Sequence, residues 1–235
     1  MNKRLIVALD VPDLKSAKKL VKILYPTVEM FKVGSILFTA CGPEIVDIVQ
    51  KAGGKVFLDL KFHDIPNTVA HAAEEAVKLG VFMFNVHASG GVKMMAAAVE
   101  AARKTAALQA KPKPLVLAVT VLTSMDESDL RQLGILRSAS EQVIYLASLA
   151  KEAGCDGVIC SVEEAVSIRK TLDSNFVIVT PGIRPAGGDI TDQKRTATPH
   201  NAVEAGSDYL VVGRPIIEAP DPLAAANKIL EEMGV

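Results

Sequence analysis

Cysteine is scarce in this chain. Cys41, Cys155 and Cys160 are its three cysteines, and they form no C-x-x-C motif. A disulfide framework or a zinc ribbon is therefore not expected, because both need more thiols at closer spacing. We interpret the three as small, buried apolar side chains and expect a cytoplasmic location, where thiols stay reduced.

Long apolar runs are also missing. The first run, residues 5–9, follows two basic residues but ends at Asp10, which makes it too short for a signal-peptide core or a membrane span. The formal net charge is −1, so the chain lacks the positive field typical of proteins that bind nucleic acid or anionic membranes. We expect neither nucleic acid nor a membrane as a partner.

Several motifs that carry known chemistry are absent from the sequence. It contains no P-loop, no nucleophile elbow and no glycine-rich dinucleotide fingerprint, and the first apolar run leads into Asp10-Val11-Pro12-Asp13 instead. No histidine pair at helical spacing is backed by a carboxylate. His63 and His87 could approach Asp59, but Lys61 would compete there as a cation. The sequence therefore predicts no metal site.

What the chain does contain is a strict alternation of two kinds of segment. Short apolar, β-branched runs predict strands, and amphipathic patterns between them predict helices. Such alternation implies parallel strands with helical crossovers, and eight units in 235 residues match an α/β fold, a single (β/α)₈ TIM barrel over residues 1–235. A doubly wound open sheet is the alternative. The strands are expected at 5–9, 28–33, 56–60, 82–86, 115–119, 157–160, 176–179 and 209–212, and the helices at 14–24, 45–52, 69–79, 92–107, 140–153, 163–172 and 223–233.

Proline and glycine mark the ends of several expected helices. Pro43 and Pro222 fit first-turn positions, where a missing amide hydrogen costs nothing. Gly53, Gly80 and Gly154 follow the last apolar positions of their helices and fit C-terminal caps. These signals support the helix assignments independently of periodicity.

The most informative segment is residues 59–68, where charged residues crowd the point at which a predicted strand passes into a predicted helix. Side chains two residues apart in a strand share a face, so Asp59, Lys61 and His63 should point one way. A lysine held close to carboxylates is a common way to position and tune a proton donor. The alternative is a structural ion pair with Asp64 as a helix cap. The apolar residues that alternate with the charged ones should be buried under a helix; they are Leu58, Leu60 and Phe62.

Polar residues also follow the ends of other predicted strands. In a barrel these ends lie together and carry the functional site. Lys32 and Asp10 would extend the charged set into a network, although each alone could be a snorkelling lysine or a turn residue. The residues concerned are Asp10, Lys32, Asp59, Lys61, Asp64, Asn85, His87, Thr120, Thr123, Ser124, Arg184, Gly213 and Arg214.

The last two strands of the expected barrel lead into segments that suit an anion. Gly213 allows close approach of the backbone and Arg214 offers a planar fork, which together suit a phosphate. Arg184 belongs to the same end. Residues 181–199 are rich in glycine and proline and are interpreted as a binding loop or lid that contains Gln193. The alternatives are a surface turn with a solvated arginine at Gly213-Arg214 and a plain surface loop at residues 181–199.

Asp59-x-Lys61-x-x-Asp64-Ile65-Pro66-x-Thr68 closely resembles the signature of the orotidine 5′-monophosphate (OMP) decarboxylase family. Further segments resemble that family in the same order, so the resemblance covers essentially the whole chain and is closest to the compact bacterial branch. These segments are residues 8–10, 32–34, 85–91, 119–125, 180–184 and 212–215.

The resemblance implies the chemistry of the reaction centre. Lys61 is expected to protonate C6 of the pyrimidine as carbon dioxide leaves, with Asp59 near the departing carboxylate. Lys32 and Asp64 would complete a catalytic network. The family uses no metal or organic cofactor, works as a homodimer and completes the synthesis of uridine 5′-monophosphate (UMP).

The resemblance also implies how the substrate is held. Asp10 and Lys32 would bind ribose hydroxyls, and Thr123 would lie at the pyrimidine. Asp64, Ile65 and Thr68 would reach into the partner subunit's site. The remaining expected substrate-binding residues are Pro181 and the phosphate-closing set Arg184, Gln193, Gly213 and Arg214.

Two other functions stay open on the sequence. A magnesium-dependent sugar-phosphate lyase of the same superfamily shares the Asp-x-Lys-x-x-Asp pattern but carries an acidic metal ligand near the position of Lys32 and lacks Ile-Pro-x-Thr. A catalytically silent barrel that binds a nucleotide would keep the fold without turnover. Sensitivity to EDTA distinguishes the lyase from a metal-free decarboxylase. An assay on OMP distinguishes the silent barrel from an active enzyme.

Overall fold

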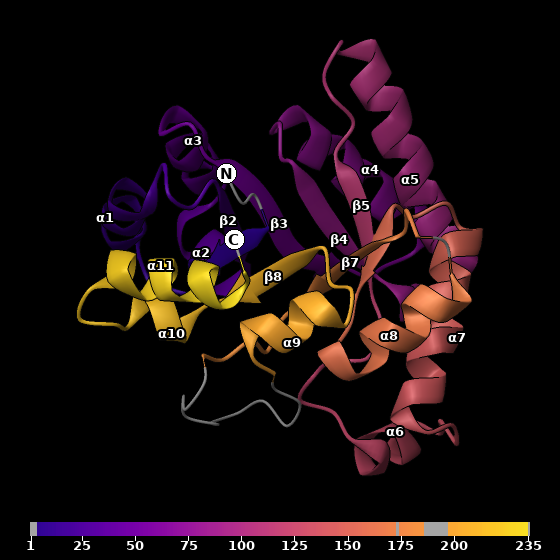
Figure 1. Cartoon of the computed structure of the whole chain (residues 1–235). Helices are drawn as coiled ribbons and strands as arrows, with labels where there is room; N and C mark the ends of the chain where they lie inside the picture. The colour runs from indigo at the N-terminus through magenta and orange to yellow at the C-terminus, as the bar shows by residue number, and fades with distance from the viewer. Residues whose placement is uncertain (1–3, 173, 186–196, 235) are drawn as a thin grey trace.

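The computed structural model describes residues 4–172, 174–185 and 197–234, and its centre is a closed barrel of eight parallel strands in sequence order (Figure 1). Closure between β1 and β8 confirms the predicted (β/α)₈ fold and excludes the open doubly wound sheet. The strands are β1 (Leu5–Ala8), β2 (Met30–Gly34), β3 (Lys55–Phe62), β4 (Met83–His87), β5 (Leu115–Val119), β6 (Gly157–Ile159), β7 (Val177–Thr180) and β8 (Tyr209–Val212).

Helices surround the strands, with α1, α3 and α11 on the left of Figure 1 and α5, α7 and α8 on the right. All seven expected helices are present, and short helical segments that the sequence did not predict lie between them. The expected ones are α1 (Leu14–Leu24), α3 (Glu44–Lys51), α4 (Pro66–Lys78), α5 (Gly91–Leu108), α7 (Ala139–Glu152), α8 (Val162–Thr171) and α11 (Pro222–Glu232). The additional ones are α2 (Ser35–Cys41), η1 (Ala88–Gly90), α6 (Glu127–Gln132), α9 (Pro199–Glu204) and α10 (Arg214–Ile217).

Helix ends follow the expected chemistry. Pro222 opens α11, while Pro43 sits one position ahead of the first turn, at the N-cap of α3. Gly53, Gly80 and Gly154 adopt φ values of +93°, +71° and +82° just after α3, α4 and α7, a backbone region that costs glycine least. The C-terminal caps are therefore confirmed.

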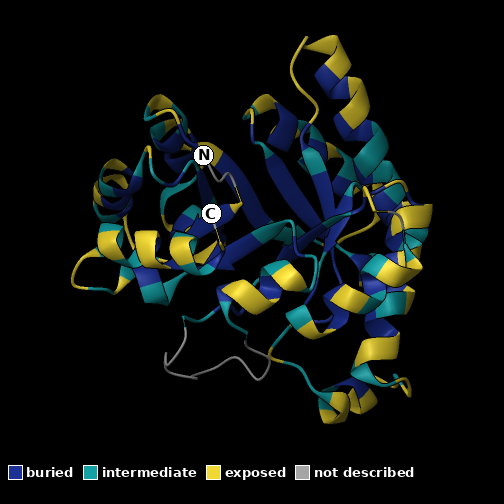
Figure 2. Cartoon of the chain, in the orientation of Figure 1, coloured by how far each residue is buried: buried dark blue, intermediate teal, exposed yellow. Residues whose placement is uncertain are grey.

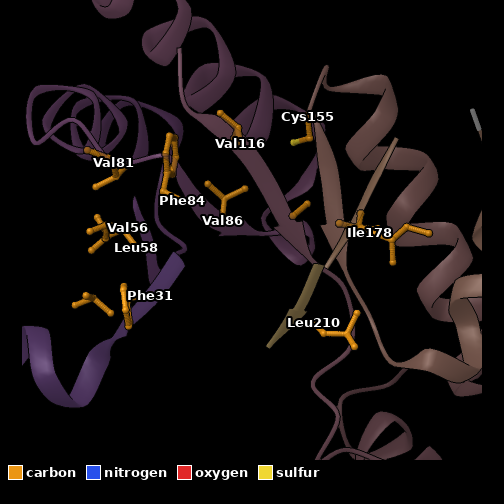
Figure 3. Packing of buried hydrophobic residues seen from close by; sticks show 14 of the residues in the cluster. Phe31, Val56, Leu58, Val81, Phe84, Val86, Val116, Cys155, Ile178 and Leu210 are labelled. Carbon is orange, nitrogen blue, oxygen red and sulfur yellow. The ribbon is translucent and has the colours of Figure 1, made fainter. Parts of the chain in front are cut away.

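The apolar residues form two layers. One cluster fills the barrel interior and includes Ile6, Met30, Met83 and Leu117. The larger cluster lies between strands and helices, and Figure 3 shows part of it, including Phe31 and Phe84. Figure 2 shows the result: the strands are buried and the exposed residues lie on the outer faces of the helices. Each large apolar side chain buried in this way contributes about 1.5–3 kcal/mol.

Two aspartates tie neighbouring strands at the amino end of the barrel. Oδ2 of Asp156, just before β6, accepts the amide of Val116 at 2.8 Å and the ammonium of Lys113 at 2.7 Å. Oδ2 of Asp208, just before β8, accepts the amide of Ile178 at 2.8 Å and pairs with Arg169. These ion pairs stabilise the amino end of the barrel. Functional sites of such barrels lie at the opposite end, where the strands have their carboxyl ends.

No helix within the described ranges is both long and apolar enough to cross a membrane. Cys41, Cys155 and Cys160 are all described, and none is in a disulfide. Cys155 and Cys160 are buried, and Cys41 is partly exposed, so the expectation of buried thiols is confirmed for two of the three.

Candidate active site

A cavity of about 280 Å³ opens at the carboxyl ends of the strands. Charged side chains from β2, β3 and the segment after β1 form one part of its wall, and loops after β7 and β8 form another. Most residues expected at the site from sequence do meet here. They are Asp10, Lys32, Asp59, Lys61, Thr123, Pro181, Arg184, Gly213 and Arg214.

The charged side chains form a continuous chain of alternating sign. Lys32 Nζ lies 3.1 Å from Asp10 Oδ1 and 3.2 Å from Asp59 Oδ2. Lys61 Nζ lies 2.7 Å from Asp59 Oδ1. The side chains of Lys32 and Asp59 are only 12% and 11% exposed, whereas that of Lys61 is 35% exposed. Asp59 is therefore shared between two ammonium groups, of which that of Lys61 is the more exposed.

The network keeps its members charged despite burial. Burial by itself would raise the pKa of Asp59, but the ammonium groups of Lys32 and Lys61 outweigh it and lower the pKa below its usual value. Burial by itself would lower the pKa of Lys32, but Asp59 and Asp10 outweigh it and raise the pKa. The buried pair Lys32 and Asp59 therefore stays ionised near neutral pH, with each buried charge compensated by a neighbour.

Lys61 has an unusual backbone. Its φ is +54°, a left-handed conformation that costs about 1–2 kcal/mol for a residue with a side chain. Regular pairing between β3 and β4 is interrupted between Leu58 and Phe62. Strain of this kind is concentrated at functional sites, where the surrounding structure holds it in place.

Asn85 holds this irregular segment; the sequence placed it among the polar residues at strand ends, but its role was not expected. Its Oδ1 accepts the amide of Lys61 at 2.8 Å, and its Nδ2 donates to Asp59 Oδ1 at 2.7 Å. One signal could have indicated this role: Asn85 is the polar residue in the apolar run of β4, at a position that alternation places inside the barrel.

Gly34 leaves space for the network at the end of β2. A Cβ on Gly34, at the end of β2, would lie 2.9 Å from Lys32 Nζ and 3.4 Å from Asp10 Oδ1. The absence of a side chain therefore lets the ammonium and the carboxylate meet above the strand end. Gly34 belongs to the segment 32–34 that was noted for its resemblance, but it was not assigned a role.

The expected sidedness of β3 is confirmed for its apolar residues. Leu58 is buried against the helices, and Leu60 and Phe62 pack on the same cluster. His63 is exposed and does not line the cavity; its ring lies 5.6 Å from that of His87. Burial, followed by the nearby His63 and Lys61, lowers the pKa of His87.

Apolar residues form a further part of the cavity wall, here called the apolar wall. It is built from inward-facing residues of β1, β3, β5, β6 and β8 and from the start of the loop after β5. None of these residues was expected at the site from sequence. In sequence they look like any other core residues, which is why they were missed. They are Ala8, Phe57, Val119, Val121, Ile159 and Val211.

The loops after β7 and β8 add a second positively charged region. Arg184 and Arg214 both line the cavity, together with Gly182 and Gly213. Ile183 bridges to Ala197, and the Arg184 amide donates to the Ala197 carbonyl at 2.9 Å, so the two described edges of the 181–199 segment are paired. Gln193 lies outside the described residues.

Three expected site residues lie away from this cavity. Asp64, Ile65 and Thr68 are exposed around the start of α4 and do not line it. Asp64 Oδ1 accepts the amide of Ile65 at 2.6 Å. Within the described part of one chain, Lys61 is paired with Asp59 and not with Asp64. A contribution from Asp64 to catalysis remains a prediction about the site of a partner subunit.

The described residues contain no group of three or more histidine, cysteine, aspartate or glutamate side chains that could hold a metal ion. The carboxylate of Asp59 is instead paired with the ammonium groups of Lys32 and Lys61. The prediction of a metal-free reaction stays a prediction.

The fold and this cavity define the class of protein: a (β/α)₈-barrel enzyme whose site lies at the carboxyl ends of the strands and carries a Lys–Asp network beside an apolar wall. A sequence model of the family described as orotidine 5′-phosphate decarboxylase / HUMPS matches residues 3–229, and the chain belongs to that family.

Named relatives are similar over nearly their whole length. The chain is 55% identical to the orotidine 5′-phosphate decarboxylase of Moorella thermoacetica, over 98% of this chain and 92% of that protein. It is 54% identical to the enzyme of the same name from Syntrophotalea carbinolica, over 99% and 95% of the two chains. Among solved structures, orotidine 5′-phosphate decarboxylase from Lactobacillus acidophilus matches with a TM-score of 0.88 and 39% identity, over 99% of this chain and 100% of that one.

Proposed function

We propose that this chain decarboxylates OMP to UMP without a metal or organic cofactor, and that Lys61 delivers the proton to C6. The observation that carries the proposal is the placement of Lys61 Nζ 2.7 Å from the buried carboxylate of Asp59, in a cavity that also has an apolar wall. Membership of the family and the names of its relatives support the substrate.

The chemistry needs a fixed positive charge beside C6. When the bond between C6 and the carboxylate breaks, its electron pair remains on C6, which has no adjacent electron sink. The Lys61 ammonium stabilises that charge and then donates its proton, leaving a neutral amine. With its side chain 35% exposed, Lys61 can regain a proton from solvent after product release.

Asp59 and Lys32 prepare Lys61 for this role. The carboxylate of Asp59 holds the Lys61 ammonium in one place, which removes the reorganisation that water would require. Lys32, bonded to Asp59 on its other oxygen, keeps that carboxylate ionised and fixed. The substrate carboxylate would approach Asp59, and its departure as neutral carbon dioxide removes a like-charge contact.

The rest of the cavity suits the rest of the nucleotide. The apolar wall fits the planar pyrimidine, with Thr123 and Pro181 beside it. Asp10 and Lys32 would bind ribose hydroxyls. Arg184, Arg214 and Gly213 would hold the phosphate, together with Gln193, and this remote binding energy can be used to order the site for reaction.

The exposed residues at the start of α4 suit a shared dimer site. Asp64, Ile65 and Thr68 follow directly on the network strand, and Ile65 is 65% exposed. Ile36, in α2 after the neighbouring strand, is 62% exposed. Two exposed isoleucines that follow the neighbouring strands β2 and β3 favour burial against a second copy, with Asp64, Ile65 and Thr68 reaching the partner's site. The few cysteines suit a cytoplasmic enzyme.

An absorbance assay on OMP, run with and without excess EDTA, tests the function. The proposal predicts loss of OMP and formation of UMP at the same rate in both. Activity on a sugar phosphate that EDTA abolishes and magnesium restores would assign the chain to the lyase alternative. Tight UMP binding without OMP turnover would assign it to a silent nucleotide-binding barrel.

A further inference from the structure

Asn85 is the buried residue on which the geometry of the charged network depends. It lies in β4, is 0% exposed and does not line the cavity, so it does not face the space a substrate would occupy. Its side-chain amide nevertheless contacts both members of the Lys61–Asp59 pair. The carbonyl oxygen accepts the Lys61 amide at 2.8 Å, and the amino group donates to Asp59 Oδ1 at 2.7 Å.

These bonds close a ring. Asp59 Oδ1 accepts a hydrogen bond from Asn85 Nδ2 and another from the Lys61 ammonium, each at 2.7 Å. The same lysine is held at its backbone by Asn85 Oδ1. The side-chain amide of Asn85 therefore fixes two things. It fixes the carboxylate of Asp59, which orients the Lys61 ammonium, and it fixes the main chain of Lys61 itself. Neither end of Lys61 can shift without breaking a bond to Asn85 or to the carboxylate that Asn85 holds.

The strand pairing explains why a side chain is needed here. Leu58 pairs with Phe84 and Phe62 pairs with Val86, so Asn85 is the single residue of β4 opposite residues 59–61 of β3. A regular ladder pairs residues one to one, so the backbone of Asn85 alone cannot pair with all of residues 59–61. Lys61 has φ +54° in this stretch, and its amide is satisfied by the Asn85 side chain. The irregular backbone that carries the proton donor is thus stabilised from the neighbouring strand.

We propose that Asn85 is a positioning residue for decarboxylation, which sets the backbone of Lys61 and the carboxylate of Asp59 so that the ammonium points at the reacting carbon. This inference rests on the proposed role of Lys61. Asparagine suits the position because it offers an acceptor to an amide and a donor to a carboxylate from one short side chain. Aspartate keeps the acceptor but lacks the donor, and alanine lacks both.

The other possible role is structural: an amide that satisfies buried polar groups and has no bearing on the reaction. Kinetics separate the two roles. A positioning residue acts on the chemical step, so its loss lowers kcat and leaves KM nearly unchanged, because the phosphate and ribose contacts are intact. A structural residue changes how much protein is folded but leaves the turnover of each folded site unaltered.

The experiment compares Asn85→Ala and Asn85→Asp with wild type, and expresses kcat per UMP-binding site counted by calorimetric titration. We expect kcat per site to fall about 100-fold in both variants, the loss typical of a misplaced reacting group, with KM within about threefold. Ser207→Ala is the matched control. Ser207 is 3% exposed and its hydroxyl lies 2.7 Å from that of Thr180, ahead of β8, so this variant also loses a buried hydrogen bond but should keep kcat per site.

The pH profile gives a second readout. Removing the donor of Asn85 takes away a bond to the charged form of Asp59, so the acid limb of kcat/KM should move to higher pH in Asn85→Ala and not in Ser207→Ala. A kcat per site within threefold of wild type in either Asn85 variant would overturn the inference. If Asn85→Ala does not fold, Asn85→Asp, which keeps the shape and the acceptor, decides by the same criterion.

Lys61→Ala, measured in parallel, separates this inference from the proposed function. If Lys61→Ala retains turnover, the role of Lys61 fails. If Lys61→Ala is inactive while the Asn85 variants turn over at the wild-type rate, the positioning role of Asn85 alone fails.

Discussion

Lys61 Nζ lies 2.7 Å from Asp59 Oδ1, and the pair is held where regular pairing of β3 with β4 is interrupted. The contact places a partly exposed ammonium on a carboxylate that is otherwise buried. Lys32 binds the second oxygen of the same carboxylate, so Lys61 is not needed to neutralise Asp59 by itself. Its proton can be given away without leaving Asp59 unpaired.

Arg214→Ala should lower kcat/KM for OMP by about 100-fold or more, because a phosphate contact to arginine is charge-assisted and its energy is used to order the site. Slow turnover of orotidine, which lacks the phosphate, should hardly change. Steady-state kinetics on both substrates make the comparison. Arg103→Ala, which removes an exposed arginine paired with Glu100 on α5, is the control. Equal losses on the two substrates would mean that Arg214 does not bind the phosphate.

Mixing two inactive variants should restore activity if the site is shared across a dimer. Lys61→Ala and Asp64→Ala homodimers each lack one charge at every site. In a shared-site heterodimer, one site carries both lesions and the other carries neither, so random exchange should return about a quarter of wild-type activity, as expected for a two-fold interface. The measurement is OMP turnover after the subunits have exchanged.

The control for this experiment is each variant taken through the same exchange procedure alone. A site confined to one chain would keep a lesion in every copy, and mixing would then restore nothing. No recovery despite demonstrated exchange would remove Asp64 from the partner's site and leave the decarboxylase function standing.

His87 should make folding stability depend on pH. Burial, with His63 and Lys61 nearby, lowers its pKa in the folded state below 6.5, so between that lowered pKa and 6.5 the unfolded chain binds more protons than the folded one. The stabilisation is fully present above pH 6.5 and is lost as the pH falls below it. Denaturant unfolding at pH 7.5 and pH 5 should show a smaller loss in His87→Asn than in wild type.

His200→Asn is the matched control, since the His200 side chain is 63% exposed and pairs with Glu204 at the surface. It should follow the wild-type curve apart from the small effect of a surface ion pair. An identical pH dependence in His87→Asn and wild type would show that His87 does not titrate differently on folding.

Much of the fold could be predicted because it repeats a simple pattern. The runs at residues 115–119 and 209–212 coincide with β5 and β8, since a buried strand must be apolar and end where turn residues begin. The short helices α6 and α10 were missed because one or two turns carry too few residues to show a helical period. Tertiary contacts decide their conformation, and the sequence does not reveal those contacts.

The charged residues of the site could be predicted from sequence, whereas its apolar residues and its backbone geometry could not. Asp10, Lys32, Asp59 and Lys61 are costly to bury alone, so their placement at strand ends indicated a network. The left-handed backbone of Lys61 gave no signal, because apolar alternation continues unbroken through Phe62. The role of Asn85 was not predicted either, because it depends on the irregular backbone of a different strand.

The most direct test of the account is OMP turnover by Lys61→Ala, with Lys55→Ala as the control. Both replace a lysine of β3, but Lys55 lies at the amino end of the strand, over the ring of Phe82 and away from the cavity. We predict that Lys61→Ala loses at least about 1,000-fold in kcat, a loss in the range of an essential general acid, while it still folds and binds UMP, and that Lys55→Ala stays close to wild type. Turnover by folded Lys61→Ala within tenfold of wild type would contradict the assignment of Lys61 as the proton donor.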